Sequence, residues 1–416
     1  MSAEITQKCT LAKEAAFAMS SIGTAVKNKA LDAIARALCD RSDEIIAANR
    51  IDTENAKNNG TRQAMIDRLT LNEERIKDMA EGVRQVMSLN DPIGEVTKMW
   101  TRPNGLQIGQ KRVPMGVIAI IYEARPNVTV DAVALCLKTS NACILRGGSE
   151  AINSNIKLME IMQEAAYGAG IPKGMLNVIE DTSRETATEL MRMNGYVDML
   201  IPRGGKGLIK SVVENATVPV VETAAGNCHV YVDAAADLDM AVKIVMNAKV
   251  QRPSVCNAAE TLLVDEKIAD EFIPRIVNEL LKSNVEIRGD EKVMSLCDDA
   301  IMATEEDYYT EYNDYIIAVK TVNGVEEAIK HINKYNTKHS EAIITNDYEV
   351  SQRFLREVDA AAVYVNASTR FTDGFEFGFG AEIGISTQKM HARGPMGLEA
   401  LTSVKYIIFG DGQIRE

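Results

Sequence analysis

The chain has 416 residues and a formal net charge of -13, with 46% hydrophobic and 25% charged residues. Domains usually run about 100–200 residues, so this length predicts two or three globular domains. The acidic balance argues against a nucleic-acid or anionic-membrane surface, which needs clustered Lys and Arg, but it is compatible with a small anionic ligand held by local basic groups.

Residues 3–90 predict a helical region. Small and aliphatic side chains recur there at helical spacing, for example at Ala12, Ala15 and Met19 and again at Leu31 and Leu38. The pair Asn59-Gly60 suits a left-handed cap and therefore predicts the end of a helix.

Residues 97–113 predict a β-hairpin that leaves the body of the domain. Asn104-Gly105 is a strong signal for a two-residue turn, and the segments 97–102 and 106–113 are its two arms.

From residue 113 onward the pattern predicts alternating strands and helices. In the first half we expect strands at 116–122, 142–145, 178–179 and 199–201, with helices at 130–137 and 152–169. In the second half we expect strands at 229–233, 261–264, 316–321 and 342–344, with helices at 238–248, 268–282 and 325–334. Such alternation predicts doubly wound parallel sheets with right-handed crossovers. A final strand at 404–409 suits pairing at the surface, and the lack of a low-complexity linker predicts interleaved domains.

The seven cysteines and four histidines show no metal-binding pattern. An odd number of widely spaced cysteines without C-x-x-C predicts a reducing compartment. The N-terminus lacks the apolar core of a secretory signal. The apolar run 117–122 is far shorter than the ~20 residues that span a bilayer. We therefore expect a soluble, cytoplasmic protein without a metal site.

Two basic, glycine-rich turns follow predicted strands. The first contains Arg146, Gly147, Gly148, Ser149 and Glu150, and the second contains Arg203, Gly204, Gly205, Lys206 and Gly207. Glycine lets the backbone approach a ligand, a following helix N-terminus favours an anion, and a guanidinium suits a phosphate. The second turn is not a P-loop, because its Gly-Lys pair is followed by Gly. Each turn alone favours an ordinary strand-to-helix connection, whereas both together favour an extended anionic ligand such as a phosphorylated dinucleotide.

Cys256 stands on a predicted turn between a helix and the strand at 261. A thiol in this position can be exposed and can have a lowered pKa near Arg252 or a helix end, although the residues alone favour one more buried cysteine. Further along, three closely spaced glycines follow Arg370 in the segment 366–382. That segment predicts either a structured loop lining a pocket or a rigid surface loop.

These four blocks, in this order, resemble the aldehyde dehydrogenase superfamily, and most closely its γ-glutamyl phosphate reductase (glutamate-5-semialdehyde dehydrogenase) family. The similar segments are 122–131, 145–150, 201–205, 228–233, 255–264, 339–343, 366–373 and 386–401, and they extend over nearly the whole chain. The last of them is hard to obtain by chance. The chain departs from the family at Asn336, where glycine is usual, and at Phe375 and Phe379, where smaller residues are usual. These departures affect local loop shape rather than the nucleophile.

The resemblance implies an α/β fold with two doubly wound, Rossmann-like domains and a small β oligomerisation arm. It assigns residues 1–97 and 113–226 to an NADPH-binding domain and 227–365 to a catalytic domain that carries the Cys nucleophile. It assigns 98–112 and 396–416 to the arm of a homo-oligomer, and 366–395 to a return segment that lines the site.

The resemblance also implies the chemistry. Cys256 is expected to attack L-glutamyl 5-phosphate, release phosphate and form a thioester that NADPH reduces to L-glutamate 5-semialdehyde in proline biosynthesis. Asn127 is expected to contribute to the oxyanion hole, and Arg252 and Arg370 to bind substrate. Glu222 has the spacing of a water-activating glutamate, but an acyl-phosphate reductase needs no hydrolytic water, so this residue is either vestigial or handles a proton.

The same residues bear on the cofactor and on two alternative functions. NADPH is favoured over NADH because Arg146 offers a partner for a 2′-phosphate, while the usual ribose-binding carboxylate position falls on Ser149 or Glu150, depending on a one-residue shift. The alternative enzyme is a hydrolytic NAD(P)-dependent aldehyde dehydrogenase, which Glu222 supports. The alternative outside enzymes is an inactive scaffold, which the intact Cys256 argues against. The resemblance also makes the glutamate 5-kinase of the pathway a candidate partner.

Overall fold

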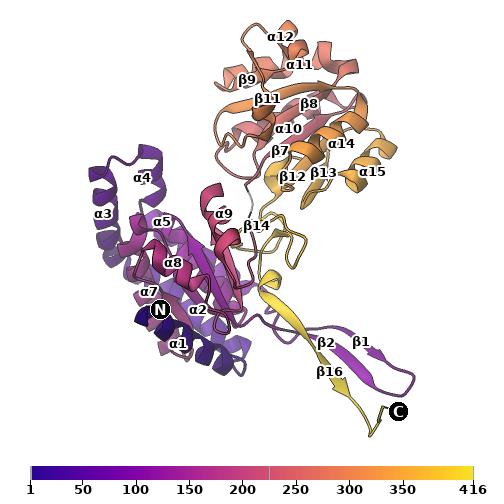
Figure 1. The fold of residues 1–416 in the computed structure, drawn as a ribbon. Helices are drawn as coiled ribbons and strands as arrows, with labels where there is room; N and C mark the ends of the chain where they lie inside the picture. Colours follow the sequence, from indigo (N-terminus) through magenta and orange to yellow (C-terminus); the bar gives the residue numbers. More distant parts are fainter. Residues whose placement is uncertain (1, 224, 416) are drawn as a thin grey trace. The chain divides into compact units, whose positions relative to one another are not determined.

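The computed structural model describes residues 2–223 and 225–415, except for the side chain of Ala64, and it divides into two compact units (Figure 1). Unit 1 comprises Met1–Thr223, Gly378–Gly384 and Met396–Glu416, and unit 2 comprises Ala224–Phe377 and Ile385–Pro395. The residues at three of these bounds, Met1, Ala224 and Glu416, lie outside the described part of the chain. The chain crosses between the units more than once, so the units are interleaved in sequence.

Unit 1 contains a parallel four-stranded sheet with the order β5-β4-β3-β6. Its strands are β3 (Val117–Tyr122), β4 (Ala142–Arg146), β5 (Leu176–Val178) and β6 (Met199–Arg203). All residues of β3 are buried, because this strand lies between β4 and β6 and is covered on both faces. Val117 of β3 is in register with Ala142 of β4.

Helices cover both faces of the unit 1 sheet. On one face α6 (Pro126–Lys138) and α7 (Ile152–Gly168) connect consecutive strands, and on the other α1 (Ala3–Met19) packs with α8 (Arg184–Leu190). The outer helices, which pack on one another and around α6 and α7, are α2 (Thr24–Asp40), α3 (Ser42–Asn58), α4 (Gln63–Leu69) and α5 (Glu73–Ser88). Helix α9 (Lys206–Asn215) follows β6 directly.

A three-stranded antiparallel sheet with the order β1-β2-β16 extends away from the helices of unit 1 (Figure 1). Its strands are β1 (Val96–Thr101), β2 (Gln107–Pro114) and β16 (Thr402–Phe409). The prediction of a two-residue turn is wrong. Arg102 N–H donates to Leu106 O at 2.8 Å and Gly105 N–H to Arg102 O at 2.9 Å, so three residues, Pro103 to Gly105, close the hairpin. The ring of Pro103 presets the backbone for the start of this turn, and Gly105 accepts a left-handed φ of 90°.

Unit 2 contains a parallel seven-stranded sheet with the order β10-β9-β11-β8-β7-β12-β13. Its strands are β7 (Cys228–Val232), β8 (Ala259–Asp265), β9 (Glu286–Gly289), β10 (Ile301–Met302), β11 (Ile316–Val322), β12 (Ser340–Ile344) and β13 (Ala362–Val365). A separate pair, β14 (Ile385–Ser386) and β15 (Gly394–Pro395), belongs to the same unit. The helices are α10 (Leu238–Val250), α11 (Glu266–Lys282), α12 (Glu291–Leu296), α13 (Glu305–Tyr309), α14 (Gly324–Tyr335) and α15 (Tyr348–Glu357).

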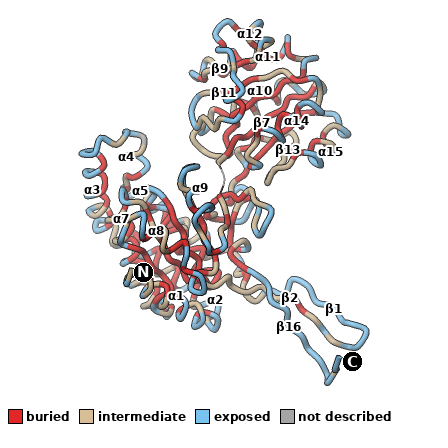
Figure 2. The backbone as a smooth tube through the Cα atoms, viewed as in Figure 1, coloured by how far each residue is buried: buried red, intermediate tan, exposed pale blue. Residues whose placement is uncertain are grey.

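Alternate residues of the unit 2 strands face two separate cores. On β7, Val230 and Val232 lie in the core packed by α10, α11 and α12, whereas Tyr231 lies in the core packed by α14 and α15. This period of two is the alternation expected of a strand covered on both faces. Figure 2 shows the central strands of each unit as buried and the arm strands as largely exposed. The predicted α/β fold with doubly wound parallel sheets is confirmed.

Candidate active site

The two glycine-rich turns leave the same edge of the unit 1 sheet. β4 ends at Arg146 and β6 ends at Arg203, and these strands flank β3. In a parallel sheet all carboxyl ends share one edge, and open α/β sheets bind ligands there. Gly147 and Gly148 lead into the short helix η1 (Ser149–Ala151) and then α7, and Gly205 precedes α9.

An anion already lies at the start of α9. The backbone N–H of Gly205 donates to Glu123 Oε2 at 3.0 Å, and a β-carbon on Gly204 would lie 2.6 Å from the Glu123 carboxyl carbon. The first N–H groups of a helix favour negative charge, so Glu123 stands where a phosphate oxygen could bind. The donors at this turn therefore fit a dinucleotide phosphate, for which Glu123 would have to move.

Arg146 is engaged with the backbone of its own unit. Its Nη2 donates to the carbonyl oxygens of Thr182 and, at 2.9 Å, Ser183. Burial lowers the pKa of Arg146, and its Nε has no hydrogen-bond partner among the described residues. A 2′-phosphate would therefore have to use the remaining N–H groups of this guanidinium or displace the two carbonyls.

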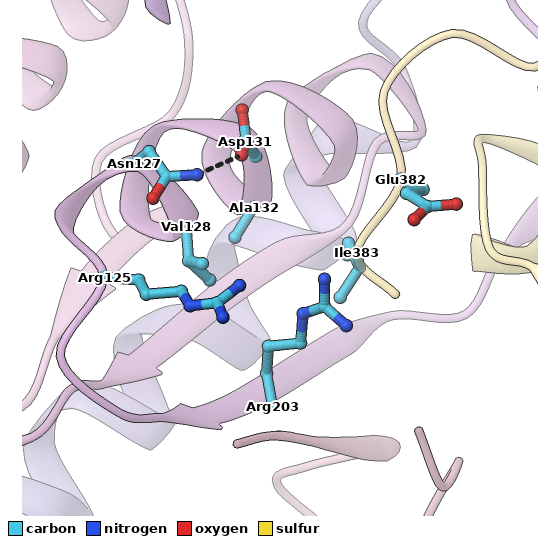
Figure 3. Close-up of a pocket in the computed structure, with 8 residues that line it drawn as sticks. All are labelled: Arg125, Asn127, Val128, Asp131, Ala132, Arg203, Glu382 and Ile383. Atoms are coloured by element: carbon cyan, nitrogen blue, oxygen red, sulfur yellow. Dashed lines mark hydrogen bonds between the residues drawn. The ribbon is translucent and has the colours of Figure 1, made fainter. Parts of the chain in front are cut away.

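A cavity of about 50 Å³ lies beside the first turn of α6. Asn127, Asp131 and Arg203 line it together with Arg125 and Glu382, and the guanidinium groups of Arg125 and Arg203 point into the same space (Figure 3). Asn127 Nδ2 donates to Asp131 Oδ2 at 3.3 Å. Burial raises the pKa of Asp131 to about 6, against the opposing effects of Asn127 and Arg203. Asn127 and Arg203, which were predicted to serve the oxyanion hole and the cofactor respectively, thus line the same cavity.

Cys256 is half-buried in the loop 251–258 of unit 2, between α10 and β8. A fully buried ion pair, Lys249 Nζ to Glu260 Oε2 at 2.6 Å, joins the two ends of this loop. Burial lowers the pKa of Lys249 and raises that of Glu260 to about 7, and their attraction opposes both shifts. Because loss of either partner would leave a buried charge uncompensated, the pair holds the loop ends together.

Two buried residues, one just before β7 and one at its start, contact the backbone of Cys256. The Cys228 thiol donates to the Cys256 carbonyl oxygen at 3.2 Å, and burial keeps the pKa of Cys228 well above its usual range. Gly226 is even closer, since a β-carbon there would lie 1.3 Å from the same oxygen. Only glycine fits at position 226 without a shift of the Cys256 backbone.

Two arginines share the surroundings of Cys256. Arg370 Nη1 donates to Asn257 Oδ1, and its Nε donates to Gln251 Oε1 at 3.1 Å. Burial lowers the pKa of Arg370, the charge of Arg252 lowers it further, and Cys256 opposes both effects. The hydrogen bonds to Gln251 and Asn257 thus place Arg370 next to the loop that carries Arg252 and Cys256, whose roles stay predictions. A cation beside a thiol favours its reactive thiolate form.

Glu222 lies in unit 1, half-buried in the segment between α9 and β7. No role was predicted from the sequence for Gly226, Cys228 or Asn257. Adjacency to Cys256 was a signal for Asn257, whereas the contacts of Gly226 and Cys228 depend on segments far apart in sequence.

Within 2–223 and 225–415, no helix is long and apolar enough to cross a bilayer. In the same part of the chain, no group of three or more His, Cys, Asp and Glu side chains is placed to share a metal ion.

Comparison with known proteins gives consistent matches. The sequence model of the aldehyde dehydrogenase family matches residues 1–309 and 308–407. The chain is 62% identical over 412 residues to the γ-glutamyl phosphate reductase of Clostridium botulinum (strain Alaska E43 / Type E3), with 99% of this chain and 100% of that protein covered. It is 61% identical over 415 residues to that of Clostridium perfringens (strain ATCC 13124), with both fully covered. The crystal structure of γ-glutamyl phosphate reductase from Thermotoga maritima aligns with a TM-score of 0.98 at 52% identity, covering 99% of this chain and 100% of that one.

Proposed function

Because this chain belongs to the aldehyde dehydrogenase family, we propose that it reduces L-glutamyl 5-phosphate to L-glutamate 5-semialdehyde with release of phosphate, a step of proline biosynthesis. The observation that carries the proposal is the full-length similarity to γ-glutamyl phosphate reductases at 62% identity. The position of Cys256 beside Arg252 and Arg370 supports it, since this chemistry needs a thiolate and an anionic substrate.

The proposed reaction begins at the Cys256 sulfur. The thiolate attacks the acyl carbon, a C–S bond forms, and the C–O bond to phosphate breaks. The backbone N–H of Cys256 holds the developing oxyanion, with the Asn127 amide as candidate second donor, and one such donor typically contributes about 3 kcal/mol. When bound, the reduced nicotinamide supplies the hydride that converts the thioester to the aldehyde level. Cys256 then leaves as a thiolate, which the neighbouring guanidinium groups favour.

The family uses a nicotinamide dinucleotide, and we propose NADPH as its form here. Gly147, Gly148, Gly204 and Gly205 allow close approach at the sheet edge, and the N-terminus of α9 offers N–H donors to a phosphate. Arg146 and Arg203 supply positive charge at the ends of β4 and β6. Ser149 or Glu150 is proposed to lie at the ribose of the cofactor. The enzyme is proposed to be cytoplasmic, with the glutamate 5-kinase of the pathway as a candidate partner.

The proposal is tested with the acyl phosphate generated in situ by a glutamate kinase and ATP. We expect NADPH to be consumed, with one semialdehyde and one phosphate formed per NADPH. The phosphate formed in a control with the kinase and ATP alone is subtracted. A chain that oxidises free aldehydes to acids, yet consumes no NADPH in this assay, would instead be the hydrolytic dehydrogenase that Glu222 suggested.

Glu222→Gln should reduce the phosphate-dependent rate only modestly, by roughly tenfold or less, because thioester hydrolysis is a wasteful side reaction for a reductase. A true hydrolytic base typically contributes about 10²–10⁴-fold, so its loss would have a far larger effect. The measurement is NADPH appearance from semialdehyde and NADP+ at saturating phosphate. A loss above a hundredfold would show that the carboxylate is needed for turnover.

Removal of residues 405–416 should convert a homo-oligomer into monomers or aggregates. β1 and β16 are the edges of the arm sheet, and unpaired edges favour pairing between chains. Trp100 packs edge-to-face on Tyr406 with ring centroids 6.3 Å apart, and Met99, Ile408 and Phe409 are also exposed. Sedimentation velocity compares the truncated and full chains. Identical sedimentation coefficients would refute the role of the arm.

A further inference from the structure

The two arginines beside Cys256 are cations without an acidic hydrogen-bond partner. No hydrogen bond or ion pair links the side chain of Arg252, which is exposed, to another described residue. The guanidinium of Arg370 donates to the amide oxygens of Asn257 and Gln251, which are neutral, and Asp373 acts on it only through space. Two neighbouring guanidinium groups repel each other, so their proximity suits an anion that this part of the chain does not itself supply.

The chemistry at Cys256 indicates which substrate anion this is. Arg370 Nη1 donates to Asn257 Oδ1, and Asn257 directly follows Cys256, so the guanidinium lies close to the residue that attacks the acyl carbon. In the proposed substrate, the phosphate is bonded directly to that carbon, whereas the α-carboxylate stands at the far end of the side chain. We propose that Arg252 and Arg370 form the phosphate subsite, which binds the phosphate as it leaves and inorganic phosphate in the reverse reaction. This inference rests on the proposed function.

Asn257 is the positioning residue of this subsite. Its Nδ2 donates to the carbonyl oxygens of Arg370 at 3.2 Å and Thr372 at 3.0 Å, and its own carbonyl accepts from the Thr369 hydroxyl at 2.7 Å. Its Oδ1 accepts from Arg370 Nη1, so one buried side chain fixes both the backbone and the guanidinium of Arg370. N–H donors on Nη1 and Nη2 remain for a phosphate, which guanidinium groups bind in a forked geometry.

The segment that carries Arg370 is further anchored to the unit 2 sheet. Thr372 Oγ1 accepts from the Ser340 hydroxyl at 2.6 Å and lies 2.7 Å from the Tyr364 hydroxyl. Ser340 begins β12 and Tyr364 belongs to β13, so the backbone on which Arg370 stands is fixed by two strands. The subsite is therefore rigid on the Arg370 side, whereas Arg252 is exposed and free to adapt.

The step balances without a further reactant. The Cys256 thiolate forms the C–S bond as the C–O bond breaks, and the phosphate leaves as an anion with the electron pair of that bond. No proton is transferred in this step, because the nucleophile is already a thiolate. Nothing is oxidised or reduced. The guanidinium groups stabilise the charge that develops on the leaving oxygen.

The first test uses Arg370→Gln and Arg252→Gln, with Arg353→Gln as the matched control. Arg353 is a surface arginine of α15 that pairs with Glu357 at 3.1 Å and has no role in the site. In semialdehyde oxidation with NADP+, we expect the KM for inorganic phosphate to rise by about tenfold or more in each site variant, the usual effect of losing a charged hydrogen bond. The KM for semialdehyde should change little, and Arg353→Gln should match the parent chain.

A second readout needs neither cofactor nor turnover. Inorganic phosphate should protect Cys256 of the parent chain from iodoacetamide, measured by mass spectrometry of the peptide that contains Cys256, and this protection should be lost in Arg370→Gln. Asn257→Ala should also raise the phosphate KM. The double variant Asn257→Ala/Arg370→Gln should be no worse than Arg370→Gln alone, because Asn257 acts through Arg370.

Unchanged phosphate KM and unchanged protection in both arginine variants would overturn the inference. So would a rise in the semialdehyde KM alone, since the arginines would then bind the α-carboxylate. If the parent chain itself oxidises semialdehyde without requiring phosphate, the proposed function fails, and that outcome is distinct from failure of the subsite alone.

Discussion

Cys256→Ala should abolish turnover while leaving NADPH binding nearly intact. Without the thiolate no thioester forms, and removal of a nucleophile that acts with its surroundings as a unit typically costs at least about 10⁴-fold in rate. The proposed cofactor groups lie on β4, β6 and α9 of unit 1, whereas Cys256 lies in unit 2, so the substitution leaves those groups in place. Turnover is followed by NADPH oxidation, and binding by quenching of the Trp100 and tyrosine fluorescence or by calorimetry.

The matched control for this variant is Cys39→Ala. Cys39 is also a free, half-buried thiol, but it lies in α2 of unit 1. It should retain the activity of the parent chain. A Cys256→Ala chain that keeps a substantial fraction of the parent rate would show that another group is the nucleophile.

Gly226→Ala should both destabilise the protein and inactivate it. The new β-carbon would lie 1.3 Å from the carbonyl oxygen, 2.2 Å from the carbonyl carbon and 2.7 Å from the Cα of Cys256, and none of these backbone atoms can rotate away. Overpacking of a well-packed interior typically costs about 1–3 kcal/mol and occasionally more, and contact with backbone leaves little room for relaxation. Any relaxation must move the Cys256 loop, and a shift of about 1 Å at a reacting atom can cost about 10²-fold in rate.

Thermal unfolding and the phosphate-dependent rate measure these two effects. Gly168→Ala is the control, since the end of α7 leaves nothing within 4 Å of an added β-carbon at that position. It should be neutral in both assays. A Gly226→Ala chain with the melting temperature and rate of the parent would contradict the close contact of positions 226 and 256.

The strands that could be predicted from the sequence are those with a simple pattern of buried residues. The apolar run of β3 is buried along its whole length, and its pattern alone predicted a buried parallel strand. By contrast β9, with Glu286 and Arg288, has alternating half-buried residues and was not predicted. Helix α12 was also missed, because it is short and buries only Val293 among its residues. Periodicity signals burial, so elements with little burial give a weak signal.

The candidate site divides in the same way. Cys256 cannot be distinguished from six other cysteines by composition, and its role came from resemblance to a family. Its supports are non-local. Gly226 lies against the backbone of Cys256, and Asn257 forms hydrogen bonds with Arg370 and its neighbours. No local sequence pattern encodes these contacts. Arg146 was predicted to bind a 2′-phosphate from its place before a glycine-rich turn. Its hydrogen bonds to the carbonyl oxygens of Thr182 and Ser183 could not be predicted from that turn.

The most direct test of the central claim is the phosphate dependence of semialdehyde oxidation. Purified chain, glutamate semialdehyde and NADP+ are mixed in a buffer free of phosphate, and NADPH appearance is measured before and after inorganic phosphate is added. We expect Cys256 to form a thioester that phosphate cleaves. NADPH should therefore form slowly at first, and its rate of formation should rise by at least about two orders of magnitude when phosphate is added. Without phosphate, release of the thioester would depend on unassisted water. Equal rates with and without phosphate, abolished by Glu222→Gln, would contradict the acyl-phosphate mechanism and identify a hydrolytic aldehyde dehydrogenase.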